Sequence, residues 1–126
     1  MNMYSSNAQQ PLAAQHSKRD VTSTARIFNF NRPVYMTDEV WQDCVELRGQ
    51  NGKVIDELAV LQRLRHVLFM ASSALHGRVK NTECEFRIHR VPNDQMSRHP
   101  EAATLMLVAH HDQFNQPVIT IQHPDD

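Results

Sequence analysis

The chain is poor in glycine and has no long apolar run. Only three glycines, Gly49, Gly52 and Gly77, occur among its 126 residues, so the sequence holds no glycine-rich loop that would cradle a phosphate. No run approaches the ~20 apolar residues of a membrane span, and residues 1–15 lack the apolar core of a secretion signal. We therefore expect a cytoplasmic protein that does not bind membranes.

Neither of the two cysteines has a partner nearby in the sequence. Cys44 and Cys84 fall on the apolar faces of predicted elements, which indicates buried, reduced thiols. The chain has no Cys-x-x-Cys pair and no His-x-x-x-His pair on a helix, so we expect no metal and no cofactor. A metal site assembled across the fold, for example from His89, His110 and His123, remains an open alternative.

Candidates for catalysis are equally scarce. Ser72 and Ser73 lie inside a predicted helix and not in a Gly-x-Ser-x-Gly turn. Glu83 and Glu85 share one strand face, but Arg87 lies beside them on that face. This favours a salt-bridged or solvated set over a catalytic carboxylate pair. We predict that the protein is not an enzyme and has no catalytic residue.

Charge is nearly balanced along the chain as a whole. The formal net charge is −1 with the histidines neutral, which gives no general attraction to nucleic acid or to anionic membranes. Acidic residues on and near the first helix are candidates for binding a partner: Glu39, Asp43, Glu46, Asp56 and Glu57. Basic residues later in the chain are candidates for an alternative role in nucleic-acid binding: Arg63, Arg78, Lys80, Arg87 and Arg90. No aromatic residues alternate with this basic set for base stacking, so direct nucleic-acid binding is not favoured.

Two segments have the periodicity of amphipathic helices. Thr37 is a predicted N-cap, and apolar residues recur on one helical face over residues 40–45 before the stop at Gly49. This first helix should have about three turns. Apolar residues then repeat at steps of three and four, which predicts a longer helix over residues 54–77. Its second half is apolar nearly all round, as expected for the central helix of the core.

Three strands follow the helices. Residues 83–91 alternate between apolar and polar, which predicts a half-buried strand. Residues 104–110 are apolar on both faces, which indicates the middle strand of a meander, or a second face covered by the tail or a partner. Residues 118–122 are the third strand. The fold class is α+β, with two helices packed on a three-stranded antiparallel sheet, and residues 26–35 are a candidate fourth strand.

The first 24 residues contain few large apolar side chains. Such a segment cannot bury enough apolar surface to offset its ordering entropy. We predict a flexible tail over residues 1–24, which a partner would be able to order, and a single domain over residues 25–126. If the third strand lies at an open edge of the sheet, edge pairing would also permit a homodimer.

Four segments, in order along the chain, resemble one known family. They are Pro33-Val34-Tyr35-Met36-Thr37 with Val40-Trp41-Gln42-Asp43-Cys44-Val45, then residues 64–71, then Val91-Pro92, and last Pro117-Val118-Ile119-Thr120-Ile121. The pattern resembles a domain-of-unknown-function family of small proteins from bacterial plasmids and other mobile elements, over residues 32–126. The resemblance implies a bacterial host cell and an accessory gene, and it supplies no catalytic residue.

Small accessory proteins of mobile elements often act by binding. The leading hypothesis is a non-enzymatic inhibitor of a host defence system, anti-CRISPR-like or anti-restriction, that protects phage or plasmid DNA. It would occlude a nucleic-acid-binding surface on a defence protein or ribonucleoprotein complex, with the acidic first helix as its interface. The alternative is a nucleic-acid-binding factor in plasmid maintenance or transfer.

Overall fold

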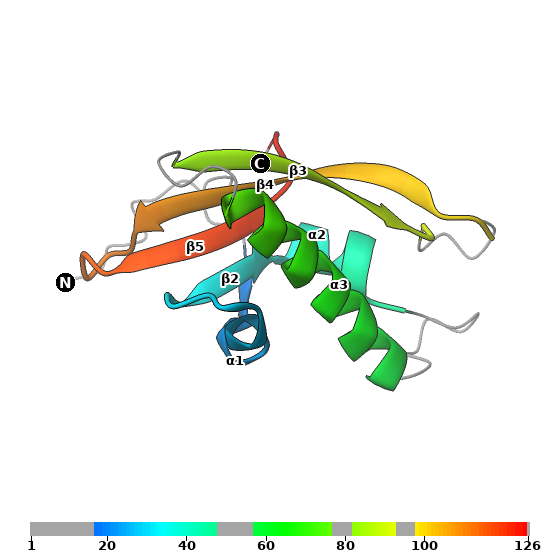
Figure 1. The fold of residues 1–126 in the computed structure, drawn as a ribbon, viewed down its shortest axis with the longest axis horizontal. Helices are drawn as coiled ribbons and strands as arrows, with labels where there is room; N and C mark the ends of the chain where they lie inside the picture. Colours follow the sequence, from blue (N-terminus) through cyan, green and yellow to red (C-terminus); the bar gives the residue numbers. More distant parts are fainter. Residues whose placement is uncertain (1–16, 48–56, 77–81, 93–97, 126) are drawn as a thin grey trace.

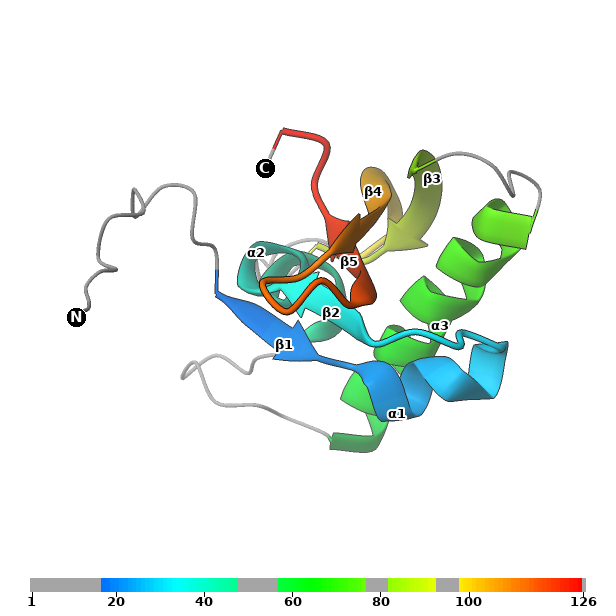
Figure 2. The same cartoon turned by 90° about the vertical axis from the view of Figure 1, so that its left-hand side faces the viewer.

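The computed structural model describes residues 17–47, 57–76, 82–92 and 98–125. They form an α+β domain in which the long helix α3 (Glu57–His76) crosses one face of a five-stranded sheet (Figures 1 and 2). The strands are β1 (Lys18–Asp20), β2 (Val34–Thr37), β3 (Glu83–Arg90), β4 (Glu101–His111) and β5 (Pro117–Gln122). The shorter helical segments are α1 (Thr22–Ala25), a 3-10 turn (Arg26–Phe28), α2 (Asp38–Val40) and a π-helical turn (Trp41–Val45).

The sheet is mixed, with the order β1-β2-β5-β4-β3. Strands β3, β4 and β5 form an antiparallel meander, while β2 runs parallel to β5 and β1 runs antiparallel to β2. The α+β class is confirmed, but the prediction of a three-stranded antiparallel sheet is wrong. The fourth strand, β2, pairs with a strand more than eighty positions away, and its parallel direction has no signature in the local sequence.

Strand β4 is the middle strand of the meander, as the sequence predicted. Val108 lies opposite Glu83 on one side and opposite Thr120 on the other. Strand β5, in contrast, does not lie at an edge of the sheet. On its outer side it pairs with β2, and the N–H of Ile119 donates to the carbonyl of Pro33 at 2.9 Å. The edges of the sheet are β1 and β3.

The domain begins earlier than the sequence predicted. The side chains of Val21 and Ala25 are buried, and the N–H of Val21 donates to the carbonyl of Val34 at 2.9 Å. The hydroxyl of Thr22 accepts a hydrogen bond from the N–H of Val34 at 3.0 Å. Residues 17–24 therefore belong to the domain, because backbone pairing and the buried side chain of Val21 hold them. The predicted flexibility of residues 1–16 lies outside the described residues.

The first helix is shorter than predicted. Thr37 is its N-cap, as expected, and the Thr37 hydroxyl accepts a hydrogen bond from the N–H of Val40 at 3.3 Å. After Val40 the helix widens into the π-helical turn, which closes where the N–H of Glu46 donates to the carbonyl of Trp41 at 2.8 Å. Glu46 itself has an extended backbone, so the helix stops before the predicted end at Gly49.

Helix α3 is the central helix of the core, as predicted. Its buried residues face the buried residues of all the longer strands. The helix contributes Leu64, Val67, Leu68 and Ala71, and the sheet contributes Val34, Met36, Phe86, Ile88, Leu105, Leu107, Ile119 and Ile121. Among the described residues no helix is both long enough and apolar enough to cross a membrane.

Replacing the fully buried Leu68 tests this core. Leu68→Ala leaves a cavity between α3 and the sheet, so we expect the free energy of unfolding to fall by about 2–5 kcal/mol. Urea denaturation measures the change. The matched control is Leu58→Ala on the same helix, where the side chain is 63% exposed and the loss should stay below about 0.5 kcal/mol. Equal losses in the two variants would contradict the assignment of α3 as the core helix.

Candidate functional site

Asp43 is the centre of an ion-pair network that joins three parts of the chain. Its Oδ1 accepts hydrogen bonds from Arg90, from Nη2 at 2.8 Å and from Nε at 3.1 Å, and its Oδ2 lies 3.0 Å from Nε2 of His123. Burial raises the pKa of the Asp43 carboxyl, but the hydrogen bonds from His123 and Arg90 outweigh burial and hold this pKa below its usual value. The Asp43 carboxylate is thus ionised and bound to Arg90 and His123 within the protein.

The other predicted acidic residues do not share one surface with Asp43. Glu46 is buried, with 7% of its surface exposed, because the chain turns inward after the π-helical turn. Glu39 and Glu57 are exposed, and Asp56 lies outside the described residues. Glu46 is therefore not on an exposed helix face, and the partly exposed Asp43 is bound to Arg90 and His123; a role for these two residues in partner binding stays a prediction. A role for Glu39 and Glu57 in partner binding remains a prediction.

The predicted basic residues are also separated. Arg90 binds Asp43 and donates to the carbonyl of Glu101 at 3.2 Å. Nη2 of Arg63 donates to the carbonyl of Val91 at 3.4 Å. Arg87 is exposed on β3. Arg78 and Lys80 lie outside the described part of the chain, so the structure does not gather this set into one basic surface.

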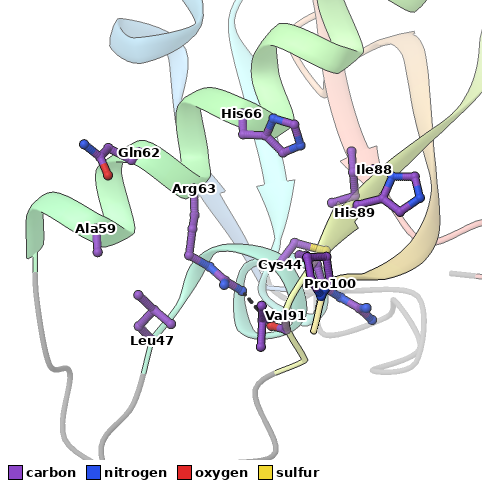
Figure 3. A pocket seen from close by; sticks show the side chains of 11 residues that line it. Cys44, Leu47, Ala59, Gln62, Arg63, His66, Ile88, His89, Val91 and Pro100 are labelled. Carbon is purple, nitrogen blue, oxygen red and sulfur yellow. Dashed lines mark hydrogen bonds between the residues drawn. The ribbon is translucent and has the colours of Figure 1, made fainter. Parts of the chain in front are cut away.

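A pocket of about 360 Å³ opens between α3, the π-helical turn and the end of β3 (Figure 3). In this pocket His66 comes from α3 and His89 from β3, while Arg63 extends from α3 toward Val91. Nε of Arg63 is buried and has no hydrogen-bond partner among the described residues. The pocket is lined by Cys44, Leu47, Ala59, Gln62, Arg63, His66, Ile88, His89, Arg90, Val91 and Pro100. Its walls are mostly aliphatic with cationic and imidazole groups, which suits an apolar group that also carries a hydrogen-bond acceptor.

The thiol in this pocket is held in its protonated form. Burial, reinforced by the negative charge of Asp43, raises the pKa of Cys44 to about 12. The Sγ donates to Oδ2 of Asp43 at 3.6 Å, which also favours the protonated form. At neutral pH the thiol is therefore un-ionised, and the thiolate is the reactive form of cysteine. Cys84 is likewise buried, as the sequence predicted for both cysteines.

Of the described residues, His89, His110 and His123 lie at three separate places. His123 binds Asp43, whereas Nε2 of His110 lies 2.7 Å from the hydroxyl of Thr120, and His89 lines the pocket. Within residues 17–47, 57–76, 82–92 and 98–125, no three or more His, Cys, Asp or Glu side chains come close enough to hold a metal ion. The open alternative of a site built from His89, His110 and His123 therefore gains no support from their placement.

The face of the sheet opposite α3 is the feature that the sequence analysis did not identify as a site. On this outer face the side chains of β3 are exposed, and Met106 and Val108 of β4 are half-buried. At the far end of β4, a shallow pocket of about 430 Å³ lies beside Phe114, whose surface is 74% exposed. The pocket is lined by Lys18, Tyr35, His110, Asp112, Gln113, Phe114 and Val118. We call Met106 and Val108 together with the residues of this pocket the outer-face strip.

The turn that presents Phe114 is well defined. Oδ1 of Asp112 accepts hydrogen bonds from the N–H of Phe114 at 2.8 Å and from the N–H of Gln116 at 2.9 Å. Asn115 has a positive φ of 61°, which asparagine tolerates. The backbone is therefore fixed by bonds that do not involve the aromatic ring, and the ring is held at the surface. The signal in the sequence was the doubly apolar segment 104–110 followed by an isolated Phe.

The chain matches no protein-family model, no curated protein and no solved structure.

Removing the charge of Asp43 should destabilise the protein in a pH-dependent way. Asp43→Asn leaves the largely buried Arg90 without its anionic partner, so we expect a loss of about 1–3 kcal/mol at pH 7. The pKa of Asp43 is lower in the folded protein than in the unfolded chain. Its stabilising contribution is thus complete above the unfolded value of about 4 and is lost as the pH falls through the folded value.

Denaturation at pH 7 and at pH 3 measures this effect. The difference between wild type and Asp43→Asn should narrow at the lower pH. The control is Asp38→Asn, which breaks the more exposed pair with Arg19 (3.0 Å) and should cost less than about 0.5 kcal/mol. A gap that widens on acidification would contradict the lowered pKa.

Proposed function

We propose that the protein is a non-enzymatic binding protein that inhibits a bacterial host defence system, and that the outer-face strip is its docking surface. The observation that carries the proposal is the exposed Phe114 next to the pocket formed with Tyr35 and His110. Aromatic residues and Met in a pocket are the usual anchors of protein interfaces. The resemblance to small mobile-element proteins supports the choice of a defence protein or ribonucleoprotein complex as the partner.

The protein would block the nucleic-acid-binding surface of its partner by its volume, and not by imitating the negative charge of a nucleic acid. Asp43 is bound to Arg90, and Glu46 is buried, so these carboxylates are not available to replace phosphates. The half-buried Met106 and Val108 instead offer apolar surface beside the aromatic pocket. When a defence protein binds this strip, the volume of the bound inhibitor would keep nucleic acid away from the neighbouring surface of the defence protein.

The chemistry of the described site residues also favours binding over catalysis. The Cys44 thiol is un-ionised at neutral pH, and the histidines are bound elsewhere or separated. Arg63 uses its Nη2 on a backbone carbonyl. These groups hold the fold together: the Asp43 carboxylate binds Arg90 and His123 and accepts from the un-ionised Cys44 thiol, which favours a structural role for this cluster.

The alternative, a nucleic-acid-binding factor for plasmid maintenance or transfer, has weaker support. Of its five residues, Arg63 and Arg90 donate to groups within the protein, and Arg87 is exposed on β3 without a neighbouring aromatic ring on the opposing strand. A gel shift at two salt concentrations separates the two functions, because binding through phosphate contacts weakens steeply with salt.

Replacing Phe114 tests the proposed docking surface. Phe114→Ser keeps the backbone hydrogen bonds of the turn and removes the aromatic anchor. In cells that carry an active restriction or CRISPR system, we expect wild type to raise the survival of targeted plasmid or phage DNA, and Phe114→Ser to lower that protection by about tenfold or more. The readout is transformation or plaque efficiency, together with co-purification of the tagged protein with the defence complex.

The matched control is Leu58→Ser, which removes an exposed apolar side chain from the opposite side of the molecule. It should protect as well as wild type. If Phe114→Ser also protects fully, the outer-face strip is not the interface. If wild type neither protects DNA nor co-purifies with any defence complex tested, the proposed function itself is wrong.

A further inference from the structure

Strand β3 leaves one full edge of the sheet open. It is the last strand in the order β1-β2-β5-β4-β3, and no described element pairs with its free side. The hydrogen-bond phase follows from Thr82, whose carbonyl accepts from the N–H of Ala109 at 2.7 Å. In an antiparallel pair such bonding residues alternate along the strand. The even-numbered residues of β3 therefore bond to β4, and the N–H and C=O groups of the odd-numbered residues point away from the sheet.

The side chains at these outward-bonding positions have an ordered charge pattern. Glu83 and Glu85 occupy the first half of the strand, and Arg87 and His89 occupy the second half. All four side chains are exposed. Charges on an edge strand ordinarily prevent pairing with another strand. Here, however, the acidic residues before Phe86 and the basic residues after it lie at equal distances from Phe86. An antiparallel second copy would therefore place acidic residues opposite basic ones.

We propose that two copies of the protein form a two-fold dimer by antiparallel pairing of their β3 strands, centred on Phe86. In this register Glu85 lies opposite Arg87 of the second copy, and Glu83 lies opposite His89. Each odd-numbered residue then uses its outward N–H and C=O in the new ladder; the carbonyl of Glu85, which accepts a weak hydrogen bond from the Cys84 thiol at 3.7 Å, has a second lone pair for the new bond. The two five-stranded sheets join into one continuous sheet.

The charges select this register over its neighbours. Moving the two-fold axis by one residue toward the start of β3 places Glu85 opposite Glu85 of the second copy. Moving it by one residue toward the end places Arg87 opposite Arg87. Like charges directly opposite each other are destabilising, whereas opposite charges stabilise a cross-strand pair. The register centred on Phe86 brings no like-charged pair together over Glu83–Arg90, whereas the registers centred on Glu85 and on Arg87 each do.

The other face of the strand is compatible with the same register. Cys84, Phe86 and Ile88 point toward α3 and are buried. At the axis Phe86 would face Phe86 of the second copy in a non-hydrogen-bonded pair, where side chains approach most closely. Cys84 would face Ile88. The apolar core would thus continue across the junction, and no charged residue would be forced into it.

Charge-reversal variants test the dimer directly. Glu85→Arg places Arg opposite Arg, and Arg87→Glu places Glu opposite Glu, so each change converts two attractive contacts into two repulsive ones by symmetry. We expect each variant to raise the dimer dissociation constant by about tenfold or more, as measured by sedimentation equilibrium. Mixing the two variants restores both opposite-charge pairs. The mixture should therefore form a heterodimer that native mass spectrometry identifies by its mass.

The control is Glu57→Arg, the same charge change at the exposed start of α3, which should dimerise like wild type. In addition, the amides of Glu85 and Arg87 should exchange with solvent more slowly at high protein concentration than at low concentration. A wild-type chain that stays monomeric up to about 0.1 mM, or a dimer that survives both single reversals, would overturn the proposal. These measurements need no defence protein, so their outcome is independent of the proposed inhibitory role.

Discussion

The parallel pairing of β2 with β5 is the contact on which most of the fold depends. It places Val34 beside Ile119 and Met36 beside Ile121, and so fills the centre of the core from both ends of the chain. It also fixes the position of helix α2 (Asp38–Val40), because the N-cap of α2, Thr37, is the last residue of β2. From there the π-helical turn directs the carboxylate of Asp43 toward β3 and the segment after β5. There Asp43 binds Arg90, which is 47 positions away in the sequence, and His123, which is 80 positions away.

This dependence explains which parts of the fold were predictable. Helix α3, strand β3 and the Thr37 cap are set by neighbours within a few residues, and sequence periodicity identified them. Strand β1 reads Lys-Arg-Asp and has no β-strand pattern of its own. It forms a strand because its backbone pairs with β2, and β2 is held in place because its other side pairs with β5. Such pairing depends on residues far apart in the sequence, which local periodicity cannot reveal.

The candidate site divides in the same way. Acidic residues on a short helix look exposed when helical periodicity alone is considered, yet Glu46 is buried after the π-helical turn, and Asp43 is only partly exposed and bound to Arg90 and His123. The burial of both cysteines was predictable, since each falls on an apolar face. The outer-face strip had one local signal, a strand that is apolar on both sides. Sequence reasoning left open whether a tail or a partner covers that strip, because the position of β4 inside the sheet does not determine what lies above it.

Edge pairing and surface binding are connected through the geometry of the sheet. Pairing through β3 would leave β1 and β2 at the outer ends of the joined sheet, because β3 is the opposite edge from β1, while β4 and the turn around Phe114 that follows it would lie nearer the junction. The two outer-face strips would then lie on the same side of one continuous sheet, since antiparallel pairing about a two-fold axis perpendicular to the sheet preserves its faces. A small domain would thereby present two copies of its docking surface at once. Two linked weak contacts bind far more tightly than either contact alone, so a sheet edge with self-complementary charges would give a 126-residue chain the reach to occlude a large nucleic-acid-binding complex.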